Sequence, residues 1–207
     1  MRVGSAEGRS ESKGSFQDRF DKGLIKPEIV GLPAGTVITD GMKFPKMFLE
    51  ATTKFGTTDE PLTDEEAKLR AGLDEESWVK LWDLVTHAVR LSNEEYLKAG
   101  FNVPDGKLEA GWMADGSFCI VDVFGTQDEN RLIDLKTGDL YSKDLLRNWL
   151  KKERPEWYAS LVKAKKEFRT DKSKWPGYPP IAEDRVALIS SRYAEAAKRY
   201  TGITVNY

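Results

Sequence analysis

The most regular pattern of apolar and polar positions lies between residues 63 and 99. Residues 63–66 read TDEE, a capping box in which the threonine and the last glutamate satisfy backbone N–H groups at a helix start. They predict a short helix that ends at Gly72. Asp74 is expected to cap a longer helix to about Ala99, because apolar residues recur at helical spacing. These are Trp78, Leu81, Trp82, Val85, Val89 and Tyr96.

The second half of the chain predicts three further helical segments. Ser142 is expected to cap an amphipathic helix over residues 143–152. Residues 151–175 mix basic and aromatic residues with four acidic ones, which favours a solvated helix whose aromatic side chains pack inward. After the sequence WPGYPP, a last helix is predicted from about Glu183 to Tyr200, and Gly202 ends it. A short strand pair with a turn at residues 136–138 precedes these helices.

The N-terminal part shows no such periodicity. Residues 1–23 are rich in glycine, serine and charge and predict a mobile lead-in or a loop over a site. Residues 24–54 carry three prolines and predict extended, irregular structure with a strand near residues 47–52. We therefore divide the chain into a flexible or irregular segment, 1–30, and a folded lobe, 31–207.

Residues 107–125, KLEAGWMADGSFCIVDVFG, predict a β-hairpin. Asp115-Gly116 suits a two-residue type I′ turn, which would set Ala114 opposite Ser117. Glu109 would then face Asp122 across the strands, on one face with Lys107. The other face would be apolar and packed, through Leu108, Ala110, Trp112, Cys119, Val121 and Val123.

Two like charges that face each other destabilise a hairpin unless a proton, a lysine or a cation lies between them. Mg²⁺ would resolve the repulsion, because it takes carboxylate oxygens together with substrate phosphates. The alternative is that the register slips by one residue, or that both acids reach solvent at the edge of the sheet.

Composition and charge bear on nucleic-acid binding, membrane insertion, secretion and metal binding. A chain of 207 residues with a net charge of −2 gives no electrostatic reason to expect nucleic-acid binding. The apolar runs are too short to span a bilayer, and the N-terminal residues do not form a secretory signal. A single cysteine, Cys119, makes no internal disulfide and suits a reducing, cytoplasmic setting. His87 is the one histidine and has no nearby partner for metal binding.

Several stretches together resemble SAICAR synthetase, the purine-biosynthesis ligase also called phosphoribosylaminoimidazole-succinocarboxamide synthase. Lys107-Leu-Glu109 and Ile120-Val-Asp122 are similar to its paired metal-binding strands, and Asp128 and Arg131 to its Pro-Asp-x-x-Arg loop. KDLLRNWL from Lys143, the closing PPIAEDRVALISSRYAEAAKRYTG, and upstream GLPAG, KFPKMFLEATTK and DEPLTDEEA also match in order. The resemblance extends over residues 31–202.

The resemblance implies an α+β fold, with an antiparallel sheet and packed helices, that corresponds to the larger C-terminal lobe of the ligase. It implies ATP-dependent joining of L-aspartate to the carboxylate of 5-aminoimidazole ribonucleotide carboxylate. Glu109 and Asp122 would hold Mg²⁺, and Lys107 would neutralise the carboxylate that is activated. Substrate-binding roles are implied for Ser15, Lys54, Asp59, Asp128, Arg131, Lys143 and Arg147.

The match also departs from the family pattern. The family's N-terminal lobe, which covers ATP, has no counterpart here, and Val123 and Gln127 replace an acid and a proline. These departures leave open a fragment, a subunit completed by a partner or homo-oligomer, and a divergent relative. A non-catalytic module that binds a ribotide or nucleotide is the alternative function. Nucleic-acid binding through residues 151–175 is the weakest of the hypotheses.

Overall fold

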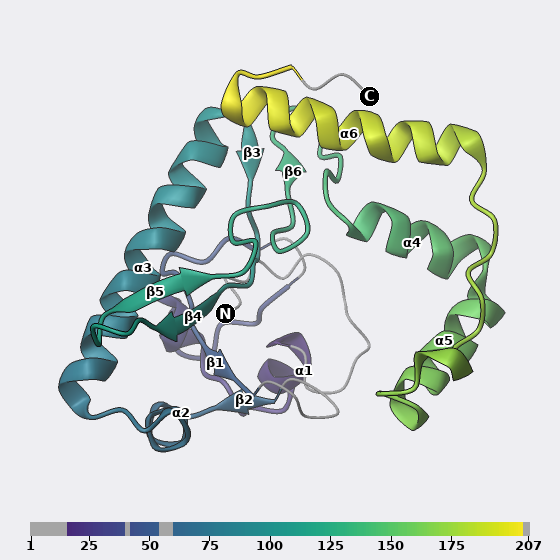
Figure 1. Ribbon diagram of the computed structural model, residues 1–207. Helices are drawn as coiled ribbons and strands as arrows, with labels where there is room; N and C mark the ends of the chain where they lie inside the picture. Colours follow the sequence, from purple (N-terminus) through teal and green to yellow (C-terminus); the bar gives the residue numbers. More distant parts are fainter. Residues whose placement is uncertain (1–15, 40–41, 54–59, 205–207) are drawn as a thin grey trace.

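The computed structural model describes residues 16–39, 42–53 and 60–204. It contains helices and small antiparallel strand pairs, which confirms the α+β class (Figure 1). The first half comprises α1 (Phe16–Asp21), η1 (Pro27–Val30), β1 (Ala51–Thr52), β2 (Pro61–Leu62), α2 (Asp64–Ala71), α3 (Glu75–Lys98) and β3 (Phe101–Asn102). The second comprises β4 (Glu109–Trp112), β5 (Phe118–Val121), β6 (Ile133–Asp134), α4 (Asp144–Glu153), α5 (Pro155–Glu167), η2 (Lys172–Lys174) and α6 (Glu183–Thr201).

The strands form three separate two-stranded ladders in the described residues, where the sequence predicted one antiparallel sheet. β1 pairs with β2, β3 with β6 and β4 with β5, all antiparallel. The β4–β5 hairpin lies against α3, and α6 crosses the end of the molecule above β3 and β6 (Figure 1). Helices α4 and α5 pack on each other on the opposite side from α3.

Local capping chemistry explains the helices that the sequence predicted. Thr63 Oγ1 accepts from Glu66 N at 3.2 Å, and Glu66 Oε2 accepts from Thr63 N at 2.9 Å. Asp74 caps α3 by accepting from Ser77 N at 2.8 Å. Among the helices of the described ranges, none is both long and apolar enough to cross a membrane.

The predicted cap at Ser142 is wrong. α4 begins at Asp144, and the residue before it, Lys143, already has helical backbone angles and makes no side-chain cap. Ser142 is only 2% exposed, and its hydroxyl has no hydrogen-bond partner. The Ser142 hydroxyl is buried and makes no bond to the backbone N–H groups of the first turn of α4, so it does not cap the helix.

Residues between 16 and 38 form most of a first apolar cluster. Ile25, Val30, Ile38 and Phe48 form it, and Val30 is fully buried. The part of the predicted irregular segment that the structure describes therefore contains α1, η1 and core residues, while residues 1–15 lie outside the described part. The boundary at residue 30 stays a prediction.

The second apolar cluster lies where α3, α6, β3 and β6 meet. It comprises Tyr96, Phe101, Leu132, Tyr141 and Ala196. Phe101 and Leu132 are fully buried, and the Phe101 ring lies 5.1 Å from that of Tyr141. This cluster supports the segment between β5 and β6 that carries several predicted site residues.

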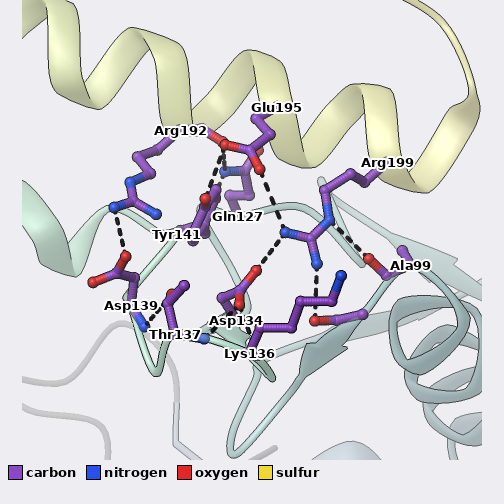
Figure 2. A network of polar contacts seen from close by, with 11 residues as sticks. Ala99, Gln127, Asp134, Lys136, Thr137, Asp139, Tyr141, Arg192, Glu195 and Arg199 are labelled. Atoms are coloured by element: carbon purple, nitrogen blue, oxygen red, sulfur yellow. Dashed lines mark hydrogen bonds and ion pairs between the residues drawn. The ribbon is translucent and has the colours of Figure 1, made fainter.

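Arg199 fastens α6 to this cluster (Figure 2). Its guanidinium lies 3.8 Å from the Phe101 ring centroid and forms an ion pair with Asp134 on β6. It also donates to the carbonyls of Ala99 and Gly100, at 2.9 Å each. Gly100 has a φ of +82°, which favours glycine, and a Cβ there would come within 2.5 Å of the guanidinium and force it to move.

Replacement of Arg199 by methionine is expected to lower the melting temperature by several degrees. The change leaves the carboxylate of Asp134, which is 5% exposed, without its ion-pair partner. Differential scanning calorimetry can compare it with Arg185→Met, which removes an exposed arginine 3.6 Å from Asp184 and should change little. Equal melting temperatures for the two variants would contradict the prediction.

Stability should also fall in acid because of Asp134. Hydrogen bonds from Arg199 and from the backbone N–H groups of Thr137 and Lys136 hold the pKa of this carboxyl far below its usual value. A depressed pKa stabilises the fold fully above the pKa of the unfolded chain, about 4, and that stabilisation is lost as the pH falls further. Urea unfolding between about pH 6 and pH 3 should show a shallower fall for Asp134→Asn than for the unaltered chain.

Candidate active site

The β4–β5 hairpin differs by one residue from the predicted register. Glu109 pairs with Val121, and Trp112 pairs with Phe118. The loop has three residues, closed by Met113 N to Ser117 O at 2.8 Å and Gly116 N to Met113 O at 3.0 Å. Gly116 has a φ of +81°, as in a type I turn followed by a left-handed residue. The predicted two-residue turn is therefore wrong. The sequence did not distinguish the two loop lengths, because Asp-Gly suits both.

The change of register redistributes the side chains. Ala110 and Trp112 share a face with Ile120 and Phe118, whereas Glu109 shares its face with Val121. The predicted apolar face thus divides between both sides of the hairpin, and Trp112, stacked on Phe118 at 4.2 Å, is half exposed. Glu109 and Asp122 do not face each other, which is the alternative register that the sequence had left open.

Glu109 has a lysine as its counter-ion. Lys107 Nζ lies 2.9 Å from Glu109 Oε1, and the Glu109 side chain is 16% exposed. The lysine is held by its backbone as well, since its N–H donates to Glu129 O at 3.1 Å. The structure therefore brings these two predicted catalytic residues together, and the ion pair offsets the cost of a half-buried carboxylate.

Asp122 follows β5 in a left-handed conformation. Its φ is +67°, the one positive value at a non-glycine residue in the described part of the chain. Its Oδ1 accepts from Val123 N at 2.9 Å, and the residue is exposed. Aspartate tolerates this conformation better than most residues, although at some cost, and such strain concentrates at functional sites. Strand alternation ends here, so register alone does not fix the side of Asp122.

A cleft of about 710 Å³ lies between the hairpin, β1 and the helices α2 and α3. Lys107 and Glu109 line it on one side, and Glu50 and Thr52 line it on another. Glu50 pairs with Arg19 of α1. The remaining lining includes Thr53, Arg70, Trp78, Trp82, Val85, Ala110 and Val121. A cleft of this size, with an apolar floor and a few charged groups, suits a small-molecule substrate.

A second group of predicted residues is connected to the hairpin by backbone pairing. Arg131 N donates to Asp105 O at 3.0 Å, and Gly106 bridges to Asn130. A side chain at Gly106 would collide with Asn130 Oδ1, since a Cβ would lie 2.1 Å from it. The two segments approach this closely because residue 106 is a glycine. Arg131 therefore lies beside Asp105, which is two residues before Lys107.

Arg131 and Arg147 meet at Asp144. Arg131 Nε donates to Asp144 Oδ2 at 2.6 Å, and Arg147 Nη1 donates to Asp144 Oδ1. Arg131 Nη1 also lies 3.0 Å from Asp105 Oδ2. Asp144 is 7% exposed. Each of its two oxygens accepts from an arginine of a different segment. The structure thus unites two cations that the sequence predicted separately.

Lys143 and Asp128 lie at the margin of this group. Lys143 Nζ is 3.8 Å from Glu129 Oε1, a loose ion pair. Asp128 Oδ1 accepts from the Tyr193 hydroxyl of α6 at 2.8 Å. Burial raises the pKa of Tyr193, and the hydrogen bond to the Asp128 carboxylate raises it further. The hydroxyl therefore keeps its proton and donates a hydrogen bond to Asp128. Ser15, Lys54 and Asp59 lie outside the described residues.

Sequence reasoning missed Asp105, Asp144 and Tyr193. Asp144 did leave a signal, because it stands three residues before Arg147 on a predicted helix, a spacing at which side chains meet. The contacts to Arg131 and Tyr193 join distant segments, so nothing local in the sequence predicted them.

Glu109 and Asp122 were predicted to hold a metal, and they do not occupy facing positions of the hairpin. No group of three or more histidine, cysteine, aspartate or glutamate side chains in the described ranges could hold a metal by itself. Mg²⁺, however, is usually bound through one or two carboxylates and completes its shell with water and phosphate oxygens. Glu109 and Asp122 supply that number of carboxylates.

Comparison with known proteins identifies the family of this chain. Residues 9–164 match the family model described as SAICAR synthetase. The phosphoribosylaminoimidazole-succinocarboxamide synthase of Thermoplasma volcanium is 31% identical over 91% of this chain and 63% of its own length. The Thermobifida fusca protein of the same name is 27% identical, over 86% of this chain and 55% of its own. The chain thus spans little more than half to under two thirds of these relatives.

Solved structures share the fold. SAICAR-synthase from Saccharomyces cerevisiae complexed with SAICAR superposes with a TM-score of 0.69 at 18% identity, over 100% of this chain and 60% of that one. A SAICAR synthetase in complex with ADP gives a TM-score of 0.57 at 19% identity, over 82% and 57%. Since the family model matches well over half of the residues, the chain belongs to the SAICAR synthetase family.

Proposed function

We propose that this chain carries the larger catalytic lobe of an ATP-dependent ligase that joins L-aspartate to 5-aminoimidazole ribonucleotide carboxylate. The observation that carries the proposal is the Lys107–Glu109 ion pair, which borders a substrate-sized cleft in a member of this family. Residues 31–207 would form the lobe. The chain spans only part of its relatives, so the nucleotide would also contact further polypeptide, in the same chain or in a partner or second copy.

The residues fit a two-step reaction. A carboxylate oxygen of the ribotide attacks the γ-phosphorus of ATP and ADP leaves, which gives an acyl phosphate. The amine of aspartate then attacks the acyl carbon, loses a proton and expels phosphate, and an amide results. Positioning and charge stabilisation supply most of the catalysis in such phosphoryl transfers.

Each charged residue has a role in that scheme. Glu109 and Asp122 would hold Mg²⁺, which offsets charge on the nucleotide phosphates when it is bound. Lys107 would neutralise the ribotide carboxylate, and Glu109 keeps its ammonium in place. Arg131, Lys143 and Arg147 would bind the ribotide phosphate, for which arginine offers a bidentate fork. Asp128 would orient the segment that carries Arg131, through its bond to Tyr193. A cytoplasmic location fits this metabolism.

The alternative is a binding module that keeps the ribotide site without turnover. It is favoured by the partial span and by Val123, where the family pattern has an acid. A direct assay separates the two functions. The purified chain would be mixed with Mg²⁺-ATP, the ribotide and aspartate, and ADP and the succinocarboxamide product would be followed together. We expect product only when all three substrates are present, whereas ribotide binding without any ADP would favour the module.

Asp122→Asn is expected to abolish turnover and leave the fold intact. Asparagine tolerates the left-handed backbone but removes the charge that a metal needs, so the melting temperature should not change while product formation is lost. Asp122→Gly should behave likewise and be at least as stable. The matched control is Asp115→Asn at the hairpin loop, where the side chain only accepts bonds from Ser117. Full activity of Asp122→Asn would exclude a metal role for this residue.

A further inference from the structure

The carboxylate of Asp144 is buried and paired rather than exposed to solvent. Its side chain is 9% exposed, and each oxygen accepts from a different arginine, Arg131 or Arg147. It stands in the first turn of α4, where a negative charge also interacts favourably with the helix. By contrast, the two arginines keep 38% and 43% of their side chains exposed. The acid is buried while the cations that it holds reach solvent.

This geometry orders two guanidinium groups that would otherwise repel each other. Arg131 comes from the loop before β6 and Arg147 from α4. Backbone bonds join the two segments nearby, from Tyr141 N to Leu132 O at 2.8 Å and from Lys143 N to Gln127 O at 3.4 Å, and the two side chains meet at the Asp144 carboxylate. Without the carboxylate, Arg147 would lose this partner while Arg131 kept Asp105, so the two guanidinium groups would no longer be held side by side and would lose conformational entropy when an anion bound. A carboxylate between the two guanidinium groups holds them in place before the anion binds. This preorganisation raises the affinity for the anion.

Three cations and three acids make up the group around this pair, so its charges balance, and the cations are its more exposed members. Asp144 offsets one of the two guanidinium charges, and Asp105 approaches Arg131 at 3.0 Å. Lys143 stands beside Asp144 with 45% of its side chain exposed, and its own acid, Glu129, is 3.8 Å away. The exposed surface of the group is therefore cationic over an acidic layer. A phosphate monoester matches such a cluster because it offers three oxygens to several donors.

We propose that Asp144 is a positioning residue that locks Arg131 and Arg147 into one site for the phosphate of the ribotide. The proposal rests on the proposed function for the identity of the anion. Asp144 does not touch the substrate, and it acts through the two arginines. Its removal should weaken binding of phosphate-bearing ligands and spare the binding of ATP at the hairpin.

The test is calorimetric titration of the full chain with the ribotide, with ribose 5-phosphate and, separately, with Mg²⁺-ATP. For Asp144→Asn we expect about 10- to 100-fold weaker binding of both sugar phosphates, since misplaced binding groups cost on that scale. Affinity for Mg²⁺-ATP should not change, which a general loss of structure would not allow. The matched control is Asp184→Asn, another first-turn aspartate beside an arginine, at 3.6 Å and exposed, with no expected effect.

A double-mutant cycle shows whether the aspartate acts through its arginine. Arg147→Met should weaken the binding of ribose 5-phosphate, and adding Asp144→Asn to it should cost much less than Asp144→Asn alone. Fully additive losses would overturn the positioning role. If Asp144→Asn does not fold, Asp144→Glu keeps the charge and displaces it by one methylene, and binding equal to that of the unaltered chain would overturn the proposal.

The outcomes also separate this proposal from the proposed function. If the unaltered chain binds neither the ribotide nor ribose 5-phosphate, the proposed function fails, and the phosphate assignment fails with it. If the unaltered chain binds both and Asp144→Asn binds them equally well, the proposed function stands and only the role of Asp144 is lost. Weaker binding of L-aspartate in place of the sugar phosphates would reassign the site to the amino-acid substrate.

Discussion

The contact between Arg199 and Asp134 is the interaction on which the arrangement of this lobe depends. One guanidinium joins the last helix to the residues that follow α3 and to β6 (Figure 2). It also lies over the face of the fully buried Phe101 of β3. The strand pairs have two residues per strand at this point, too few to hold together by backbone hydrogen bonds alone. A buried ion pair with several additional hydrogen bonds supplies the missing specificity, because it is satisfied in one arrangement only.

The site is built outward from this anchor by further contacts between distant segments. Gln127 Nε2 donates to the carbonyl of Tyr141 at 2.8 Å, and Tyr193 of α6 holds Asp128, so the segment between β5 and β6 is tied to the same helix as Arg199. That segment pairs in turn with residues 105–107, which lead into Glu109. The strand that carries Glu109 and the pair Arg131 and Arg147 are thus positioned through one connected framework, although they come from different elements.

Sequence reasoning succeeded where structure is set by neighbouring residues. The capping box at Thr63 and the glycine at the end of α6 each depend on a few adjacent residues, and both were predicted correctly. It failed where two local solutions are equally good. Asp115-Gly116 fits a two-residue and a three-residue loop, and the choice moves every side chain of a strand by one position. Ser142 has the side chain of a cap, but its hydroxyl is buried and makes no hydrogen bond to the helix.

The same distinction explains what the sequence could say about the site. Types of residue, such as two acids and a lysine in one hairpin, were enough to predict a kind of chemistry, while the contacts made by Asp144 required the fold. The register also changes what the acids mean. Because Lys107 neutralises Glu109 and Asp122 lies beyond the strand in its own turn, the hairpin does not need a cation in order to fold. Under the proposed function, affinity for Mg²⁺ would therefore depend on the phosphate ligand that accompanies it, which would link metal binding to binding of the nucleotide rather than to the stability of the lobe.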